Sequence, residues 1–78
     1  MPLLNVKVLE GVFSVEQKQE MIARLTETMV EIEGEGMRGV TWVVVEEVQS
    51  GDWGIGGQAL HTENVKALQG TEPQLASR

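Results

Sequence analysis

Two short apolar segments on either side of one amphipathic segment limit this 78-residue chain to a small set of folds. Residues 2–9 have the sequence PLLNVKVL, in which Asn5 and Lys7 alternate with apolar residues as in a β-strand. Residues 40–48, VTWVVVEEV, form a β-branched run that predicts a second strand, buried in its middle. The segment between them is long enough for the helical crossover that parallel strands require. The pattern predicts an α+β fold, a βαβ subunit with two parallel strands and one long helix.

The intervening helix is predicted to begin near Val15 and to end at Gly34 and Gly36. Ser14 and Gln17 have the spacing of a capping box, in which each side chain bonds the backbone of the other residue. Glycine takes the left-handed conformation that ends many helices. The helix should have about five turns, and its buried stripe is expected to contain five apolar residues: Met21, Ile22, Leu25, Met29 and Ile32.

A small hairpin and a polar tail are predicted after the second strand. Residues 50–60, SGDWGIGGQAL, contain four glycines, which suits a tight hairpin. We expect this hairpin to reach onto a neighbouring subunit. A short helical piece is expected near residues 65–68, followed by disorder. Residues 1–60 are therefore predicted to be the domain with its terminal hairpin, and residues 61–78 a polar, partly disordered tail.

The composition argues against several classes of function. Twelve acidic and six basic residues give a net charge of -6, which does not favour nucleic acid as a partner. The absence of cysteine excludes disulfides, thiolate zinc sites and a cysteine nucleophile. No apolar run approaches the roughly 20 residues of a membrane helix, and no signal-peptide pattern is present, so a cytoplasmic location without a membrane partner is expected. A domain this small gains stability by self-association.

Pro2 is the first candidate for chemistry, because removal of Met1 would leave a secondary amine at the start of the chain. An ordinary α-amine has a pKa of about 8, and burial in an apolar pocket lowers that pKa by disfavouring the cation. A neutral amine near pH 7 can take a proton from a carbon next to a carbonyl group and return it elsewhere. Many proteins begin with Met-Pro for no catalytic reason, so Pro2 alone does not decide the function.

Four segments, in their order and spacing, resemble the 4-oxalocrotonate tautomerase family: PLLNVKVLEG, SVEQKQEMI, VVVEEV and GDWGIGG. The resemblance covers about residues 2–60. It implies a βαβ subunit that pairs into a four-stranded dimer sheet, commonly within a homohexamer built as a trimer of dimers. It also implies an amino-terminal proline as general base for keto–enol chemistry on a small carbonyl or enol substrate, without a metal or another cofactor.

Three site residues follow from this resemblance. Pro2 matches the catalytic proline, and Leu9 matches an apolar position that lines the pocket. Trp53 matches the aromatic residue that flanks the proline and keeps it dry, where the best-known members have Phe. The alternative for Trp53 is an anchor that packs the hairpin on a neighbouring subunit.

The chain departs from the family at the two arginines that bind substrate carboxylates in the best-studied members. The corresponding positions are Val12 or Phe13, and Trp42. A dicarboxylate would lose two charge-assisted contacts, each worth about 2 to 3 kcal/mol. We therefore predict poor turnover of dicarboxylates and a pocket in which Trp42 and Trp53 favour an aromatic or monocarboxylate enol.

Arg38 and His61 complete the candidate substrate contacts. Arg38 lies four residues before Trp42 and is predicted to reach the pocket from a neighbouring subunit; the alternative is a solvated residue paired with surface carboxylates. His61 follows the hairpin, where it can donate to a substrate oxygen or simply be exposed. Glu46 and Glu47 are not expected to act as a carboxylate pair, because neighbours on a strand point to opposite faces.

The sequence thus predicts a cofactor-independent tautomerase, an isomerase, with Pro2 as its general base. Two alternatives stay open. One is a hydratase or dehalogenase in which a cationic Pro2 protonates the substrate. The other is a non-catalytic partner subunit that completes a mixed oligomer.

Overall fold

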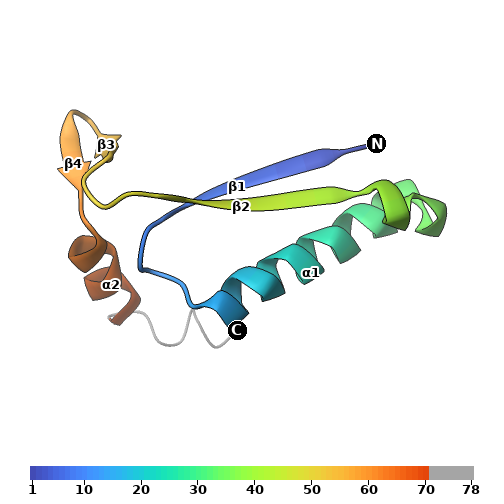
Figure 1. Cartoon of the computed structure of the whole chain (residues 1–78), viewed down its shortest axis with the longest axis horizontal. Helices are drawn as coiled ribbons and strands as arrows, with labels where there is room; N and C mark the ends of the chain where they lie inside the picture. The colour runs from blue at the N-terminus through green and yellow to red at the C-terminus, as the bar shows by residue number, and fades with distance from the viewer. Residues whose placement is uncertain (71–78) are drawn as a thin grey trace. The chain divides into compact units, whose positions relative to one another are not determined.

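The computed structural model describes residues 1–70 (Figure 1). The elements in this range are β1 (Leu3–Leu9), α1 (Val15–Glu33), the 3-10 helix η1 (Glu35–Val40), β2 (Trp42–Val48), β3 (Trp53–Ile55), β4 (Gln58–Leu60) and α2 (Thr62–Gly70). They fall into two compact units, which are described separately below. Of the described residues, the first contains 1–8 and 13–46, and the second contains 9–12 and 47–70. The predicted βαβ subunit with a C-terminal hairpin is confirmed.

Parallel pairing joins β1 and β2 in a two-stranded sheet. One backbone bond lies at each end of the pair: the Trp42 N–H donates to the Pro2 carbonyl at 3.0 Å, and the Glu10 N–H donates to the Val48 carbonyl at 2.7 Å. In a parallel ladder both bonds fit one register, in which the first residues of the two strands lie opposite each other and so do the last. The two seven-residue strands therefore pair without a bulge.

The second strand begins at Trp42 and not at Val40, where the sequence pattern placed it, because residues 35–40 form η1. Two backbone bonds with a spacing of three residues hold this turn: the Met37 N–H donates to the Gly34 carbonyl, and the Thr41 N–H donates to the Arg38 carbonyl. Such bonds tighten the chain into a 3-10 turn. The β-branched run starts inside that turn.

Helix α1 begins and ends as the sequence predicts. The Ser14 side chain accepts from the Gln17 N–H at 3.1 Å, and the Gln17 side chain accepts from the Ser14 N–H at 2.8 Å, which completes the capping box. Gly34 follows the last helical residue with a φ of 104°, and its N–H donates to the Val30 carbonyl at 2.8 Å. Local signals at both ends therefore set the length of the helix.

The buried face of α1 differs from the predicted stripe. Val30 is buried, whereas Ile32 is 77% exposed and Ile22 is 39% exposed. Met21, Leu25 and Met29 are half-buried. Ile32 lies two positions from Val30, which places it on another side of the helix, so its inclusion in the stripe was wrong. Figure 1 shows α1 running alongside β1 and β2.

Few side chains are buried in residues 1–70. The buried apolar residues are Val8, Leu9, Val12 and Val30. Large apolar side chains remain exposed along the chain: Met1, Leu3, Val15, Ile22, Ile32, Val40, Trp42, Ile55 and Leu68. So much exposed apolar surface is unusual for a stable monomer and is typical of a surface that associates with another chain.

The second unit contains the predicted hairpin. β3 pairs with β4 in antiparallel fashion, with Trp53 opposite Leu60. Gly56 and Gly57 form the two-residue turn with φ values of 58° and 85°, as a type I′ turn requires.

Helix α2 follows the hairpin and is anchored at its first residue. The Thr62 N–H donates to the Ser50 hydroxyl at 3.0 Å, and the Thr62 hydroxyl donates to the Glu10 carbonyl at 2.5 Å. The helical piece expected near residues 65–68 lies inside α2. The expected disorder further along the tail concerns residues 71–78, outside the described residues. None of the helices in residues 1–70 combines the length and apolarity needed to cross a membrane.

Gly34→Ala is expected to destabilise the protein by about 1 to 2 kcal/mol, because an L-residue strains at a φ of 104°. Gly36→Ala is the matched control: its backbone has no positive φ, and a Cβ would meet nothing within 4 Å at either glycine. Its effect should stay within about 0.5 kcal/mol. Urea unfolding at one fixed protein concentration measures both, and equal losses would contradict this account of the helix end.

Candidate active site

Pro2 lies just before β1 and is hydrogen-bonded to the first residue of β2. Its carbonyl accepts the Trp42 N–H at 3.0 Å, and the residue is half-buried. Its nitrogen carries no N–H and takes no part in the strand pairing. In the full-length chain this nitrogen belongs to the Met1–Pro2 peptide bond and has no basicity. Met1 is 76% exposed, so the bond that must be cut to create the amine lies at the surface.

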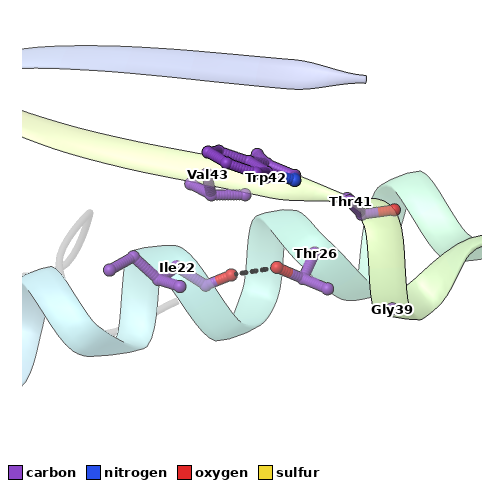
Figure 2. A pocket seen from close by; sticks show the side chains of 6 residues that line it. All are labelled: Ile22, Thr26, Gly39, Thr41, Trp42 and Val43. Atoms are coloured by element: carbon purple, nitrogen blue, oxygen red, sulfur yellow. Dashed lines mark hydrogen bonds between the residues drawn. The ribbon is translucent and has the colours of Figure 1, made fainter. Parts of the chain in front are cut away.

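A cavity of about 330 Å³ lies between α1 and the start of β2, in the same unit as Pro2 (Figure 2). Its lining residues are Ile22, Thr26, Gly39, Thr41, Trp42 and Val43. Figure 2 shows Ile22 and Val43 on facing elements, with the Trp42 ring along β2. The cavity is at the small end of the range for ligand sites. Its lining contains no charged side chain, which suits an uncharged or aromatic group.

Two threonine hydroxyls belong to the lining of this cavity. The Thr26 hydroxyl donates to the Ile22 carbonyl at 2.7 Å. The Thr41 hydroxyl lies 2.8 Å from the Met37 carbonyl and is also bonded to the Glu33 carboxylate. Each hydroxyl proton is therefore already donated within the protein, and these two hydroxyl oxygens can only accept a hydrogen bond from a ligand.

Arg38 is bound by two carboxylates and does not line the cavity. Its guanidinium contacts Glu27 of α1 and Glu35 of η1, each at 2.5 Å for the shorter of two bonds. Hydrogen bonds from Arg38 hold the pKa of both carboxyl groups below the usual range, and the carboxylates in turn raise the pKa of Arg38. The structure thus shows the pairing with surface carboxylates that was the alternative to a substrate contact.

The other predicted contacts lie in the second unit. Leu9 is buried, and Trp53 is half-buried at the first position of β3. His61 is exposed; its N–H donates to the Asn64 side chain at 3.0 Å, and its ring packs so closely on Gly51 that a Cβ there would lie 3.2 Å from the ring. The structure therefore brings Pro2 and Trp42 together within one unit and places Leu9, Trp53 and His61 in the other.

The positions that correspond to the missing arginines carry no charge. Val12 is buried, Phe13 is half-buried and Trp42 is 54% exposed. Elsewhere in residues 1–70, Lys7 is paired with Glu46, at 2.7 Å, and Arg24 with Glu20. Hydrogen bonds from Lys7 and Asn5 lower the pKa of the Glu46 carboxyl. Within the described part of the chain no group of three or more His, Cys, Asp or Glu side chains could hold a metal ion.

Several site features were missed from the sequence. Thr26 and Thr41 line the cavity, but an isolated threonine in a helix or before a strand carries no sequence signal for binding. By contrast, the spacing of three residues between Glu35 and Arg38 can be recognised in the sequence and predicts a local ion pair. Glu27 lies eleven residues from Arg38, and their contact depends on the turn of the chain at Gly34.

Comparison with known proteins identifies the family. The model of the family described as tautomerase enzyme matches residues 2–63. The chain belongs to the tautomerase family. Similar to this tautomerase are a probable tautomerase of Campylobacter jejuni, 37% identical over 67 residues (86% of this chain, 97% of the relative), and probable tautomerase K2 of Dickeya dadantii, 33% identical over 60 residues (77% and 88%).

A solved structure supports the fold of the tautomerase. The crystal structure of apo unfused 4-OT matches it with a TM-score of 0.68 at 29% identity, over 82% of this chain and 98% of that one. The resemblance to the 4-oxalocrotonate tautomerase family is thereby confirmed, together with the βαβ architecture. The protein is an enzyme of the isomerase class.

The Arg38 cluster predicts how the stability of the tautomerase depends on pH. A carboxyl group whose pKa is lowered by folding stabilises the protein above its unfolded pKa, and that contribution is lost as the pH falls through the folded value. Arg38→Ala should therefore be destabilising at pH 7, and the difference from the native protein should shrink below pH 4.5, the ordinary pKa of these glutamates.

Urea midpoints at pH 7, 5 and 3.5 measure this difference. Arg24→Ala is the control, because Arg24 is an exposed arginine paired with the Glu20 carboxylate on the same helix, and such pairs contribute little. A difference between native protein and Arg38→Ala that stays constant across this pH range would contradict the prediction.

Proposed function

We propose that this tautomerase is a cofactor-independent keto–enol isomerase in which Pro2, after removal of Met1, is the general base. One observation carries the proposal. In a chain of this family, the carbonyl of Pro2 is fixed by the backbone N–H of Trp42 at the start of the sheet. A base held in place by the ladder keeps its orientation while the nitrogen stays free to react.

The reaction needs only proton transfers. The Pro2 nitrogen, with a lone pair once Met1 is gone, takes the proton of the enol hydroxyl as the carbonyl double bond forms. The electron pair of the former carbon–carbon double bond then takes the proton back at carbon. Nothing is oxidised or reduced, and the amine returns to its neutral form. A pKa near or below the working pH serves such a base.

We infer the substrate class from the charges around the cavity that Trp42 lines. The cavity beside β2 has no charged lining, and Arg38 is engaged by Glu27 and Glu35. A substrate with two carboxylates would have to be desolvated there without a partner cation, which is costly. We propose an aromatic or monocarboxylate enol, of the phenylpyruvate type, whose ring contacts Trp42. Leu9, Trp53 and His61 remain proposed contacts from the second unit.

Self-association belongs to the same proposal. A two-stranded sheet is marginal alone, and within residues 1–70 neither of its outer edges pairs with a further strand. Exposed Leu3 and Trp42 lie opposite each other at the first position of the strands, on one face. We propose that copies of this chain pair into four-stranded sheets and assemble as a homohexamer, with the hairpin reaching a neighbouring subunit.

Pro2→Ala should lower kcat/KM for ketonisation of enol phenylpyruvate by about 100-fold or more, the usual range for loss of a positioned base. Intact mass must first show that Met1 is removed from both proteins. The control is a chain with an uncleaved residue before Pro2, in which the nitrogen is an amide and turnover should fall to background. Because Pro2→Ala keeps a primary amine at the chain end, unchanged turnover in the chain with the uncleaved residue is the result that would rule out the Pro2 nitrogen as the base.

The pKa of the Pro2 amine separates the base from a cationic acid. Titration of the mature protein labelled with 15N-proline should give a pKa below that of an ordinary α-amine, about 8, because the site is partly dry and apolar. The pH–rate profile of enol ketonisation should rise with the same pKa. A pKa well above neutrality would instead support the hydratase or dehalogenase alternative.

A further inference from the structure

Arg38 makes a double fork with two carboxylates. Toward Glu35, its Nε lies 2.5 Å from Oε2 and its Nη2 lies 3.1 Å from Oε1. Toward Glu27, its Nη1 lies 2.5 Å from Oε2 and its Nη2 lies 3.1 Å from Oε1. All three guanidinium nitrogens and all four carboxylate oxygens are engaged. Bidentate contacts of this kind fix orientation as well as distance, so the cluster ties η1 to α1.

The backbone carries this constraint to Pro2. The Arg38 carbonyl accepts the Thr41 N–H at 3.2 Å, which closes the last turn of η1. The next residue, Trp42, donates its N–H to the Pro2 carbonyl at 3.0 Å. The Thr41 hydroxyl adds a bond to the Glu33 carboxylate of α1. Trp42, which bonds Pro2, therefore lies directly after a turn that is held by both side-chain and backbone hydrogen bonds.

We propose that Arg38 is a positioning residue of the Pro2 site, and that Glu27 and Glu35 hold it in this role in place of substrate binding. The proposal rests on Pro2 being the reacting group. The cluster has one positive and two negative charges, so a substrate carboxylate would have to displace a bidentate carboxylate and meet the other. Arg38 acts instead by fixing the start of β2. Its loss should shift Pro2 and lower kcat by the same factor for every substrate.

Three variants test this role: Arg38→Ala, Arg38→Lys, and the double variant E27Q/E35Q. Arg24→Ala is the matched control, an arginine of α1 paired with Glu20. Each is assayed with a monocarboxylate enol and with its methyl ester, which carries no charge. The expected result is a fall in kcat of about 10-fold in all three variants, equal for acid and ester, with no change in Arg24→Ala; a displacement of about 1 Å can cost up to 100-fold.

A direct substrate contact gives the opposite pattern and would overturn the proposal. Arg38→Ala would then raise KM for the acid alone, Arg38→Lys would keep much of the acid activity, and E27Q/E35Q would raise kcat/KM for the acid by freeing the guanidinium. Unchanged kcat in all three variants would overturn the proposal as well. Circular dichroism and native mass spectrometry show that each variant is folded and assembled; Arg38→Lys and E27Q/E35Q keep the test available where Arg38→Ala does not fold.

Hydrogen exchange gives a readout that does not depend on turnover. The Trp42 amide is the donor to Pro2, so its exchange should become about 10-fold faster in Arg38→Ala and in E27Q/E35Q and stay unchanged in Arg24→Ala. Equal exchange in all proteins would overturn the positioning role. Failure of Pro2 as the base appears separately, as full activity of the chain with an uncleaved residue before Pro2.

Discussion

Parallel pairing of β1 with β2 is the constraint on which the rest of the structure depends. Parallel strands cannot be joined by a tight turn, so the chain must cross over, and the 19 residues of α1 do this. The register then decides the neighbours: Trp42 bonds Pro2, and Lys7 reaches Glu46 across the strands. A slip of one residue would turn these polar side chains to the opposite face of the sheet. The register therefore determines both which side chains share a face and which residue bonds Pro2.

The small core and the polar contacts of the sheet together favour association with another chain. The buried apolar side chains in residues 1–70 are few, while Leu3 and Trp42 leave the end of the sheet apolar and exposed. Further along the strands, Asn5 and Lys7 are both bonded to Glu46 within the chain. A partner can therefore cover this surface without having to neutralise an unpaired charge, which is the costly part of burying ionic groups.

Local signals made much of the fold predictable. The capping box at Ser14, the glycine at position 34 and the glycine pair of the hairpin act over a few residues, and each produced the expected element. Features that depend on tertiary structure were not predictable. The 3-10 turn displaced the start of β2, and Val30 replaced Ile32 in the buried stripe. The roles of Leu9 and Trp53 rest on family resemblance and that of His61 on its place after the hairpin, because no local pattern in their neighbourhood specifies a contact.

The ion pairs of Arg38 limit the ways in which Pro2 can be kept uncharged. A free cation beside an amine lowers the pKa of that amine, but the positive charge of Arg38 is compensated by the carboxylates of Glu27 and Glu35. In the proposed function, Coulomb repulsion from Arg38 is therefore weak, and desolvation is left as the effect that lowers the pKa of Pro2. Desolvation requires the apolar surface around Trp42 to be covered when the enzyme works. If Pro2 is the base as proposed, the exposed residues that a neighbouring subunit would cover are also those on which the pKa of Pro2 depends, and assembly and catalysis then share one physical cause.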